Sequence, residues 1–109
     1  MKIINRIKAS DDFALTIKKG RAKRNQSFVI HYRNNEFKYT RIGISVSSKI
    51  GNAVTRNHIK RQIRSMCDSL LDYTKSIDIV IVVKKDYLDY SFEDNNESLK
   101  EILKNIDRN

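Results

Sequence analysis

Residues 49–64 read K-I-G-N-A-V-T-R-N-H-I-K-R-Q-I-R, and a helical pattern begins within them. Asn52 follows Gly51 and belongs to the residue types that cap helix N-termini. Further on, apolar residues recur at steps of four, three and four, which places them on one stripe of a helix. The stripe consists of Ile59, Ile63, Met66 and Leu70. The spacing predicts a helix that packs on a core and runs to about Tyr73 or Thr74.

A second stripe of the same helix is cationic. It consists of Arg56, Lys60 and Arg64, with Asn57 and Arg61 beside it. At about 100° per residue, this basic arc lies next to the apolar stripe rather than opposite to it. The helix can therefore pack on a core and still present its cations sideways.

The sequence around this helix has no carboxylate between Glu36 and Asp68. The same segment contains Lys38, Arg41, Lys49, Arg56, Lys60, Arg61 and Arg64. A solvated helix face is the more common explanation of a charge run, but such faces usually mix both signs. The excess of positive charge without local counter-charge favours an external polyanion as the partner.

Length and composition set the class of protein. The 109 residues fit one domain with one core, at a mean hydropathy of -0.58 and a net charge of +9. Residues 1–67 hold 16 Lys and Arg against 3 Asp and Glu, whereas residues 68–109 hold 6 against 10. No apolar run approaches the roughly 20 residues of a membrane span, and the N-terminus has no signal-peptide pattern. We expect a cytoplasmic nucleic-acid-binding protein without membrane contact.

Residue types that carry chemistry are sparse. Cys67 is the only cysteine and lies near the apolar stripe, so a buried thiol is the expected reading. His31 and His58 lack a cysteine or carboxylate cluster at metal-ligand spacing. The glycines are isolated, which gives no phosphate-binding glycine-rich loop and no dinucleotide or small-molecule cofactor. No catalytic residue is identified in the polypeptide.

The remaining sequence predicts a small α+β fold. Residues 1–8 read as a basic extended arm, residues 10–20 as a short helix capped by Ser10 or Asp11, and residues 21–27 as a basic loop. Residues 28–33 and 37–48 alternate as two strands joined by a hairpin turn at Asn34-Asn35. The β-branched run 77–83 predicts a strand buried on both faces, and a last helix starts at Ser91 or Asn95 and reaches Ile106. The order α, β, β, α, β, α gives a two-layer α/β sandwich.

One face of the predicted sheet has an open interpretation. Arg41, Gly43 and Ser45 alternate with apolar residues in one strand, as Val29 and His31 do in the other. This face is either ordinary solvent exposure or the floor of a groove for an extended nucleic-acid strand. In the second case Phe13 or His31 offers a stacking surface. Composition alone does not separate the two alternatives.

The motif in residues 49–64 resembles the signature of the protein subunit of bacterial ribonuclease P, which removes the 5′ leader from precursor tRNA. Further similarity lies in R-I-K near the start, D-F in the first helix, F-V-I, and R-I-G-I-S-V-S before the signature. The resemblance implies a left-handed β-α-β crossover. It also implies that chemistry is carried by the RNA subunit and its Mg²⁺ ions, so that the polypeptide alone is inactive.

The resemblance also implies two RNA-binding sets of residues. Contacts to the catalytic RNA subunit are expected from Lys49, Asn52, Arg56, Asn57, Lys60, Arg61 and Arg64. Contacts to the single-stranded leader of precursor tRNA are expected in a groove formed by Phe13, Ile17, Val29, His31, Arg41 and Ser45. By binding the leader, the protein is expected to improve the affinity for substrate and for Mg²⁺.

This sequence departs from the family pattern at a few positions. His58 stands where Arg is frequent, Ile17 and His31 stand where aromatic residues are frequent, and Ser48 stands where Lys is common. These differences concern single contacts. The rival interpretations are a ribosomal-type structural RNA-binding protein without a processing role, and a nuclease active without RNA.

Overall fold

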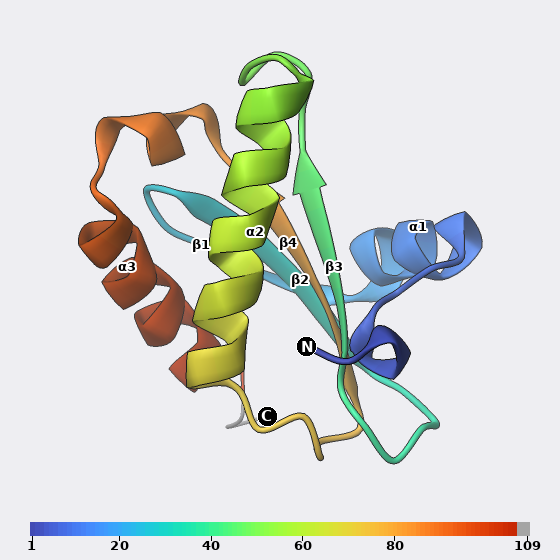
Figure 1. Ribbon diagram of the computed structural model, residues 1–109. Helices are drawn as coiled ribbons and strands as arrows, with labels where there is room; N and C mark the ends of the chain where they lie inside the picture. Colours follow the sequence, from blue (N-terminus) through green and yellow to red (C-terminus); the bar gives the residue numbers. More distant parts are fainter. Residues whose placement is uncertain (107–109) are drawn as a thin grey trace.

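The computed structural model describes residues 1–106, which form an α+β fold (Figure 1). The helices are α1 (Ser10–Lys19), α2 (Ala53–Leu70) and α3 (Phe92–Lys104). The strands are β1 (Arg21–Arg24), β2 (Phe28–Asn34), β3 (Arg41–Val46) and β4 (Ile77–Val83). Short 3₁₀ turns cover Ile3–Asn5 and Lys85–Asp89. No helix of this described part is long and apolar enough to cross a bilayer.

The four strands form one sheet in the order β1-β2-β4-β3. The β-branched strand β4 is central, antiparallel to β2 and parallel to β3. The predicted hairpin between β2 and β3 is therefore wrong, because β4 lies between these two strands. An apolar strand gains most when both of its edges are paired, and this outweighs the local turn preference of Asn34-Asn35.

The β3–α2–β4 connection joins two parallel neighbours, as the sequence order predicts. In Figure 1 both strands run upward, β3 lies in front of β4, and α2 lies to their left. This arrangement is the left-handed crossover, the rarer hand in proteins. It brings α2 and α3 to the same face of the sheet.

The core lies between that face and the two helices. Phe28, Ile30, Ile81, Ile63 and Leu99 are all fully buried there. The apolar stripe of α2 is confirmed, since Ile59, Ile63 and Met66 are buried and Leu70 is half-buried. Cys67 is buried beside them as expected, and its burial raises the pKa of the thiol to about 12.

Helix α1 lies on the opposite face of the sheet (Figure 1). Its predicted cap is wrong: Ala9 occupies the N-cap position without a side-chain bond, and Ser10 and Asp11 lie inside the first turn. The helix ends at Lys19 with Gly20 behind it, as predicted. A Cβ at Gly20 would lie 2.7 Å from the Tyr32 carbonyl oxygen, so the chain can turn closely here into β1.

Three further boundaries differ from the sequence prediction. The basic loop 21–27 contains strand β1, which pairs with β2 from Arg21↔Tyr32 to Arg24↔Val29. The N-terminal arm includes a 3₁₀ turn, and the Asn5 side-chain amide donates to the Thr40 carbonyl oxygen at 2.7 Å. Helix α2 ends at Leu70, before Tyr73, because Leu71 is already extended.

Candidate nucleic-acid interface

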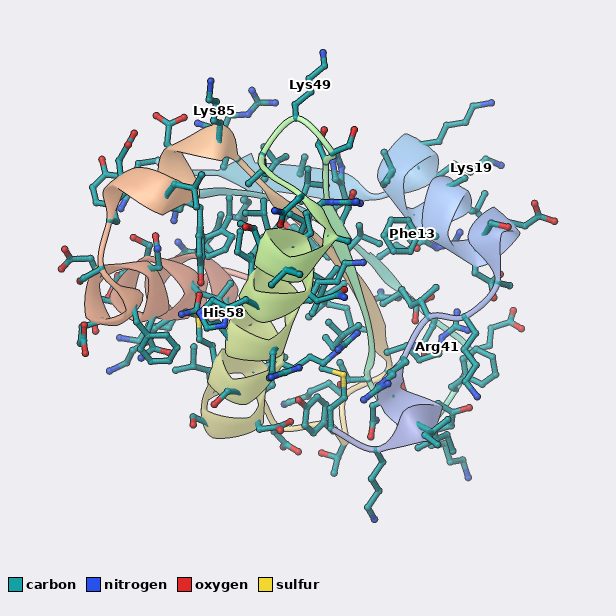
Figure 2. The ribbon with its side chains drawn as sticks, turned by 45° about the horizontal axis from the view of Figure 1, so that its top comes forward. Phe13, Lys19, Arg41, Lys49, His58 and Lys85 are labelled. Carbon is teal, nitrogen blue, oxygen red and sulfur yellow. The ribbon has the colours of Figure 1, made fainter. Side chains whose placement is uncertain are left out.

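The start of α2 is set by a side-chain cap. The Asn52 Oδ1 atom accepts a hydrogen bond from the Thr55 backbone amide at 2.9 Å, which confirms the predicted N-cap. Lys49 lies in the preceding turn, where its amide donates to the Ser47 hydroxyl at 3.1 Å. Figure 2 shows the Lys49 side chain pointing away from the body of the protein. The cap therefore fixes the direction of the helix just after an exposed cation.

The cations of α2 lie on its outer side. Asn57 and Arg61 are exposed, while Arg56, Lys60 and Arg64 are half-buried beside the apolar stripe. Half-burial of such long side chains is usual when their stems cover apolar surface and their charged ends reach water. We call the group Lys49, Arg56, Lys60, Arg61 and Arg64 the basic surface of α2.

These cations have no internal counter-charge. Within residues 1–106, no member of the basic surface of α2 forms an ion pair with a carboxylate. The Arg56 Nε atom is buried and has no hydrogen-bond partner in this part of the chain. A surface of unpaired cations attracts polyanions, and this one holds its charges on a rigid helix.

A second candidate surface lies on the sheet face that carries α1. The strand register aligns residues of β2, β4 and β3 in three rows across this face. The rows are Val29–Val82–Ser45, His31–Val80–Gly43 and Arg33–Asp78–Arg41. The predicted alternation of β2 and β3 is thus confirmed, and the two strands lie on the same face with β4 between them.

Helix α1 covers part of these rows. A Cβ at Gly43 would lie 2.5 Å from the ring of Phe13, so the ring rests directly on the glycine backbone. Figure 2 shows Phe13 between α1 and the sheet. Ile17, one helical turn later, is 38% exposed, and Val80 in the covered row is fully buried. Only Gly at position 43 permits this close approach of the aromatic ring.

The uncovered part of the face is formed by half-buried residues. We call Val29, His31, Ser45 and Val82 the open sheet face. The sequence did not single out Val82, because the run 77–83 was predicted to be buried on both sides. Its position between Val29 and Ser45 becomes apparent only from the strand order.

His31 is the titratable group of the open sheet face. Its Nδ1 atom is buried and has no hydrogen-bond partner within the described residues. Burial lowers the pKa of His31, and repulsion from Arg24 on the neighbouring strand lowers it further. At neutral pH the ring is therefore uncharged, and it offers a flat stacking surface with one donor and one acceptor nitrogen.

Arg41 differs from the sequence expectation of an unpaired cation. Its Nε and Nη2 atoms donate to Asp78 at 2.9 and 2.6 Å, and Nη1 donates to Asp12 at 3.2 Å. The guanidinium lies 4.5 Å from the ring centroid of Phe37. The hydrogen bond with Asp78 is the main cause that raises the pKa of Arg41. Its charge is neutralised internally, and the group ties α1 to β3 and β4.

A signal for this ion pair was present in the sequence. Asp78 lies inside the β-branched run 77–83, and its side chain is only 5% exposed. A carboxylate in such a strand is rarely buried without a cationic partner. Within residues 1–106, no group of three or more His, Cys, Asp or Glu side chains is arranged to hold a metal ion.

Comparison with known proteins identifies close similarity over almost the whole chain. The family model of ribonuclease P matches residues 1–107. The ribonuclease P protein component of Streptococcus equi subsp. equi is 38% identical over 104 residues, which is 95% of this chain and 87% of the relative. The component of Streptococcus pyogenes serotype M5 gives the same values.

Solved structures agree with the sequence comparison. The ribonuclease P protein of Staphylococcus aureus superimposes with a TM-score of 0.85 at 39% identity, covering 92% of this chain and 93% of the other. The ribonuclease P protein of Thermotoga maritima gives a TM-score of 0.80 at 31% identity, covering 92% and 96%. Fold and sequence are therefore similar to the same proteins across nearly their full length.

Proposed function

Because the chain belongs to the ribonuclease P protein family, we propose that its two surfaces bind two different RNAs. As a protein component of ribonuclease P, it is part of a tRNA-processing ribonucleoprotein and has an RNA partner. The proposal concerns which RNA each surface contacts. The observation that carries it is the contrast between a helix with unpaired cations and a sheet face with stacking groups.

We assign the basic surface of α2 to the catalytic RNA subunit. Its cations have no carboxylate partner within residues 1–106, and the Asn52 cap and the buried stripe hold the helix rigidly. Rigid, unpaired cations bind RNA phosphates with little ordering cost. The contacts proposed for this RNA come from Lys49, Asn52, Arg56, Asn57, Lys60, Arg61 and Arg64. Each neutralised phosphate adds about 0.7 to 0.9 to the salt-dependence slope of assembly.

We assign the open sheet face and the adjacent side of α1 to the 5′ leader of precursor tRNA. Single-stranded bases stack on aromatic rings, with roughly 1–3 kcal/mol per base. Phe13 and the uncharged His31 are the rings available here, and Ile17, Val29 and Ser45 lie next to them. For Arg41 we propose a positioning role: it holds α1 through Asp12 and leaves its charge unavailable to phosphate.

The chemistry itself is expected from the RNA subunit and its Mg²⁺ ions. The protein contributes neutralisation of phosphate repulsion, which lets RNA and substrate approach at a lower Mg²⁺ concentration. By holding the leader it also raises the affinity for precursor tRNA over mature tRNA. We expect this reaction in the cytoplasm.

Processing of a precursor tRNA tests the division of roles. The protein alone, the RNA subunit alone and both together are incubated with precursor at low and high Mg²⁺. We expect no cleavage by the protein alone, cleavage by the RNA alone only at high Mg²⁺, and cleavage by the mixture at both. Cleavage by the purified protein alone would overturn the assignment of the chemistry.

The leader assignment has its own test. Reconstituted enzyme is compared with the RNA subunit alone for its affinity toward precursor and mature tRNA. We expect the protein to improve binding of the precursor more than binding of the mature tRNA. An equal gain for both would show that the open sheet face does not sense the leader.

A further inference from the structure

A cavity of about 680 Å³ lies where β2 ends and β4 begins. This is the lower end of the sheet in Figure 1, and the turn that contains Lys49 lies at the upper end. No residue of the basic surface of α2 or of the open sheet face lines the cavity. Its charged lining residues are Lys19, Arg21, Arg33 and Lys75. We call this the distal basic cavity.

The lining carries one sign of charge. No Asp or Glu side chain is among the residues that line the cavity. Within residues 1–106, Lys19, Arg33 and Lys75 form no ion pair. Asp78, the register partner of Arg33, is already bound by Arg41 and Asn35. The cations therefore converge without a carboxylate to balance them.

Local structure explains only one of these charges. Lys19 stands in the last turn of α1, where a cation is favoured by the helix dipole. Arg33 on β2 and Lys75 in the loop before β4 have no such reason to be cationic. Asp72, whose carboxylate is influenced by Lys75, lies outside the lining. Cations from separate elements thus meet at one cavity.

The chemistry of the lining suits a phosphate group. An arginine fork binds phosphate oxygens in a bidentate manner, and lysine adds a point charge. Asn34 and Ser76 supply neutral polar groups to the same lining. The volume lies within the roughly 300–1,000 Å³ range of ligand sites, which is enough for a phosphate and its ribose.

We propose that the distal basic cavity binds backbone phosphates of RNA as a third contact, separate from the two surfaces described above. Strand β4 spans Ile77–Val83, about 20 Å at 3.3 Å per residue, between the cavity and the end of the sheet nearest Lys49. The bound segment is therefore distinct from RNA at the start of α2. The identity of this RNA, tRNA or the catalytic subunit, rests on the proposed function.

The test removes two cavity charges. The variant Arg33→Gln/Lys75→Gln is compared with Lys85→Gln/Lys100→Gln, which removes two exposed charges outside the cavity lining. Dissociation constants for the RNA subunit, and of the reconstituted enzyme for precursor and mature tRNA, are measured over a salt series. We expect the cavity variant to lower the salt slope by about 1.4 in at least one measurement, at about 0.7 per phosphate lost. The control is expected to keep the wild-type slope.

Each outcome has one reading. A change in assembly assigns the cavity to the catalytic RNA, an equal change for precursor and mature tRNA assigns it to the tRNA body, and a change for precursor only assigns it to the leader. Cavity and control variants that agree in all three measurements would overturn the proposal. If Arg33→Gln unfolds the protein, Lys19→Gln/Lys75→Gln takes its place.

The proposal and the proposed function fail in different ways. If the wild-type protein does not assemble with the RNA subunit, the proposed function is wrong. The cavity is then tested by binding of a single-stranded uridine dodecamer to the protein alone, with the same variants. Equal salt slopes for the wild type and the cavity variant in that assay would still overturn the cavity as a phosphate site.

Discussion

The basic surface of α2 and the ion-pair cluster of Arg41 come from one segment without carboxylates, yet their charges differ in use. Within residues 1–106 the α2 cations have no carboxylate partner, whereas Arg41 contacts both Asp78 and Asp12. Asp12 is 29 positions from Arg41 and Asp78 is 37 positions away. A charge that is isolated along the sequence can be fully paired in space.

The difference separates two kinds of cation by what their removal costs. Charges on the outer side of α2 stabilise nothing internal, so they are available to a partner without loss of folding free energy. Arg41 holds α1 against β3 and β4, and its side chain is only 13% exposed. The first set is expected to affect binding, and the second is expected to affect folding.

The largest effect is expected from removing the acid that Arg41 depends on. Asp78→Ala leaves a buried guanidinium without its main partner, and the free energy of unfolding should fall by about 3 kcal/mol or more. Urea denaturation measures the change. Asp12→Ala serves as the matched control, because Asp12 is partly exposed and its loss should cost much less. Equal losses for both variants would contradict the dominant role of Asp78.

Removing charges from α2 is expected to give the opposite pattern. In Arg61→Gln/Arg64→Gln, two phosphate contacts at roughly 1 kcal/mol each are lost, and assembly with the RNA subunit should weaken about thirtyfold. The salt slope of assembly should fall by about 2. Filter binding over a salt series measures both, and the free energy of unfolding should stay within about 0.5 kcal/mol of the wild type. A variant that loses stability but keeps its RNA affinity would reverse our comparison.

A smaller effect is expected where α1 rests on the sheet. In Gly43→Ala the new methyl group meets the Phe13 ring, and the shift of α1 should reduce stability and precursor affinity by about 1 kcal/mol each. Unfolding and binding measurements are repeated in a Phe13→Ala background as a double-mutant cycle. There the added cost of Gly43→Ala should disappear, since the ring is gone. An unchanged cost would show that Gly43 acts through another contact.

The smallest effect is expected from pH. The pKa of His31 is lower in the folded protein than its ordinary value of 6.5, so the unfolded chain binds the proton more readily. The stabilising contribution is complete above pH 6.5 and is lost as pH falls through the folded-state pKa. Unfolding free energies of the wild type and His31→Gln from pH 5 to 8 test this. The difference between the two proteins should change only below pH 6.5, and a constant difference would contradict it.

Sequence patterns predicted the features that depend on near neighbours. The Asn52 cap, the apolar stripe from Ile59 and the buried strand 77–83 follow from spacing along the chain, and all are present. The resemblance of residues 49–64 to a known signature indicated the family, which residue chemistry alone could not do. Composition had narrowed the partner only to a polyanion.

Features that depend on strand order were missed. The insertion of β4 between β2 and β3 is a tertiary preference, and no local turn signal reports it. Strand β1 is short and basic, so it looked like a loop until β2 paired with it. The internal pairing of Arg41 and the exposure of Val82 both follow from the same strand order.

The central claim is that assembly and leader recognition belong to separate surfaces. The most direct test measures, in the reconstituted enzyme, the ratio of precursor to mature tRNA affinity together with the affinity for the RNA subunit. Phe13→Ala should lower the ratio and leave assembly unchanged, whereas Arg61→Gln/Arg64→Gln should weaken assembly and leave the ratio unchanged once the protein is saturating. The same defect in both variants would contradict the claim.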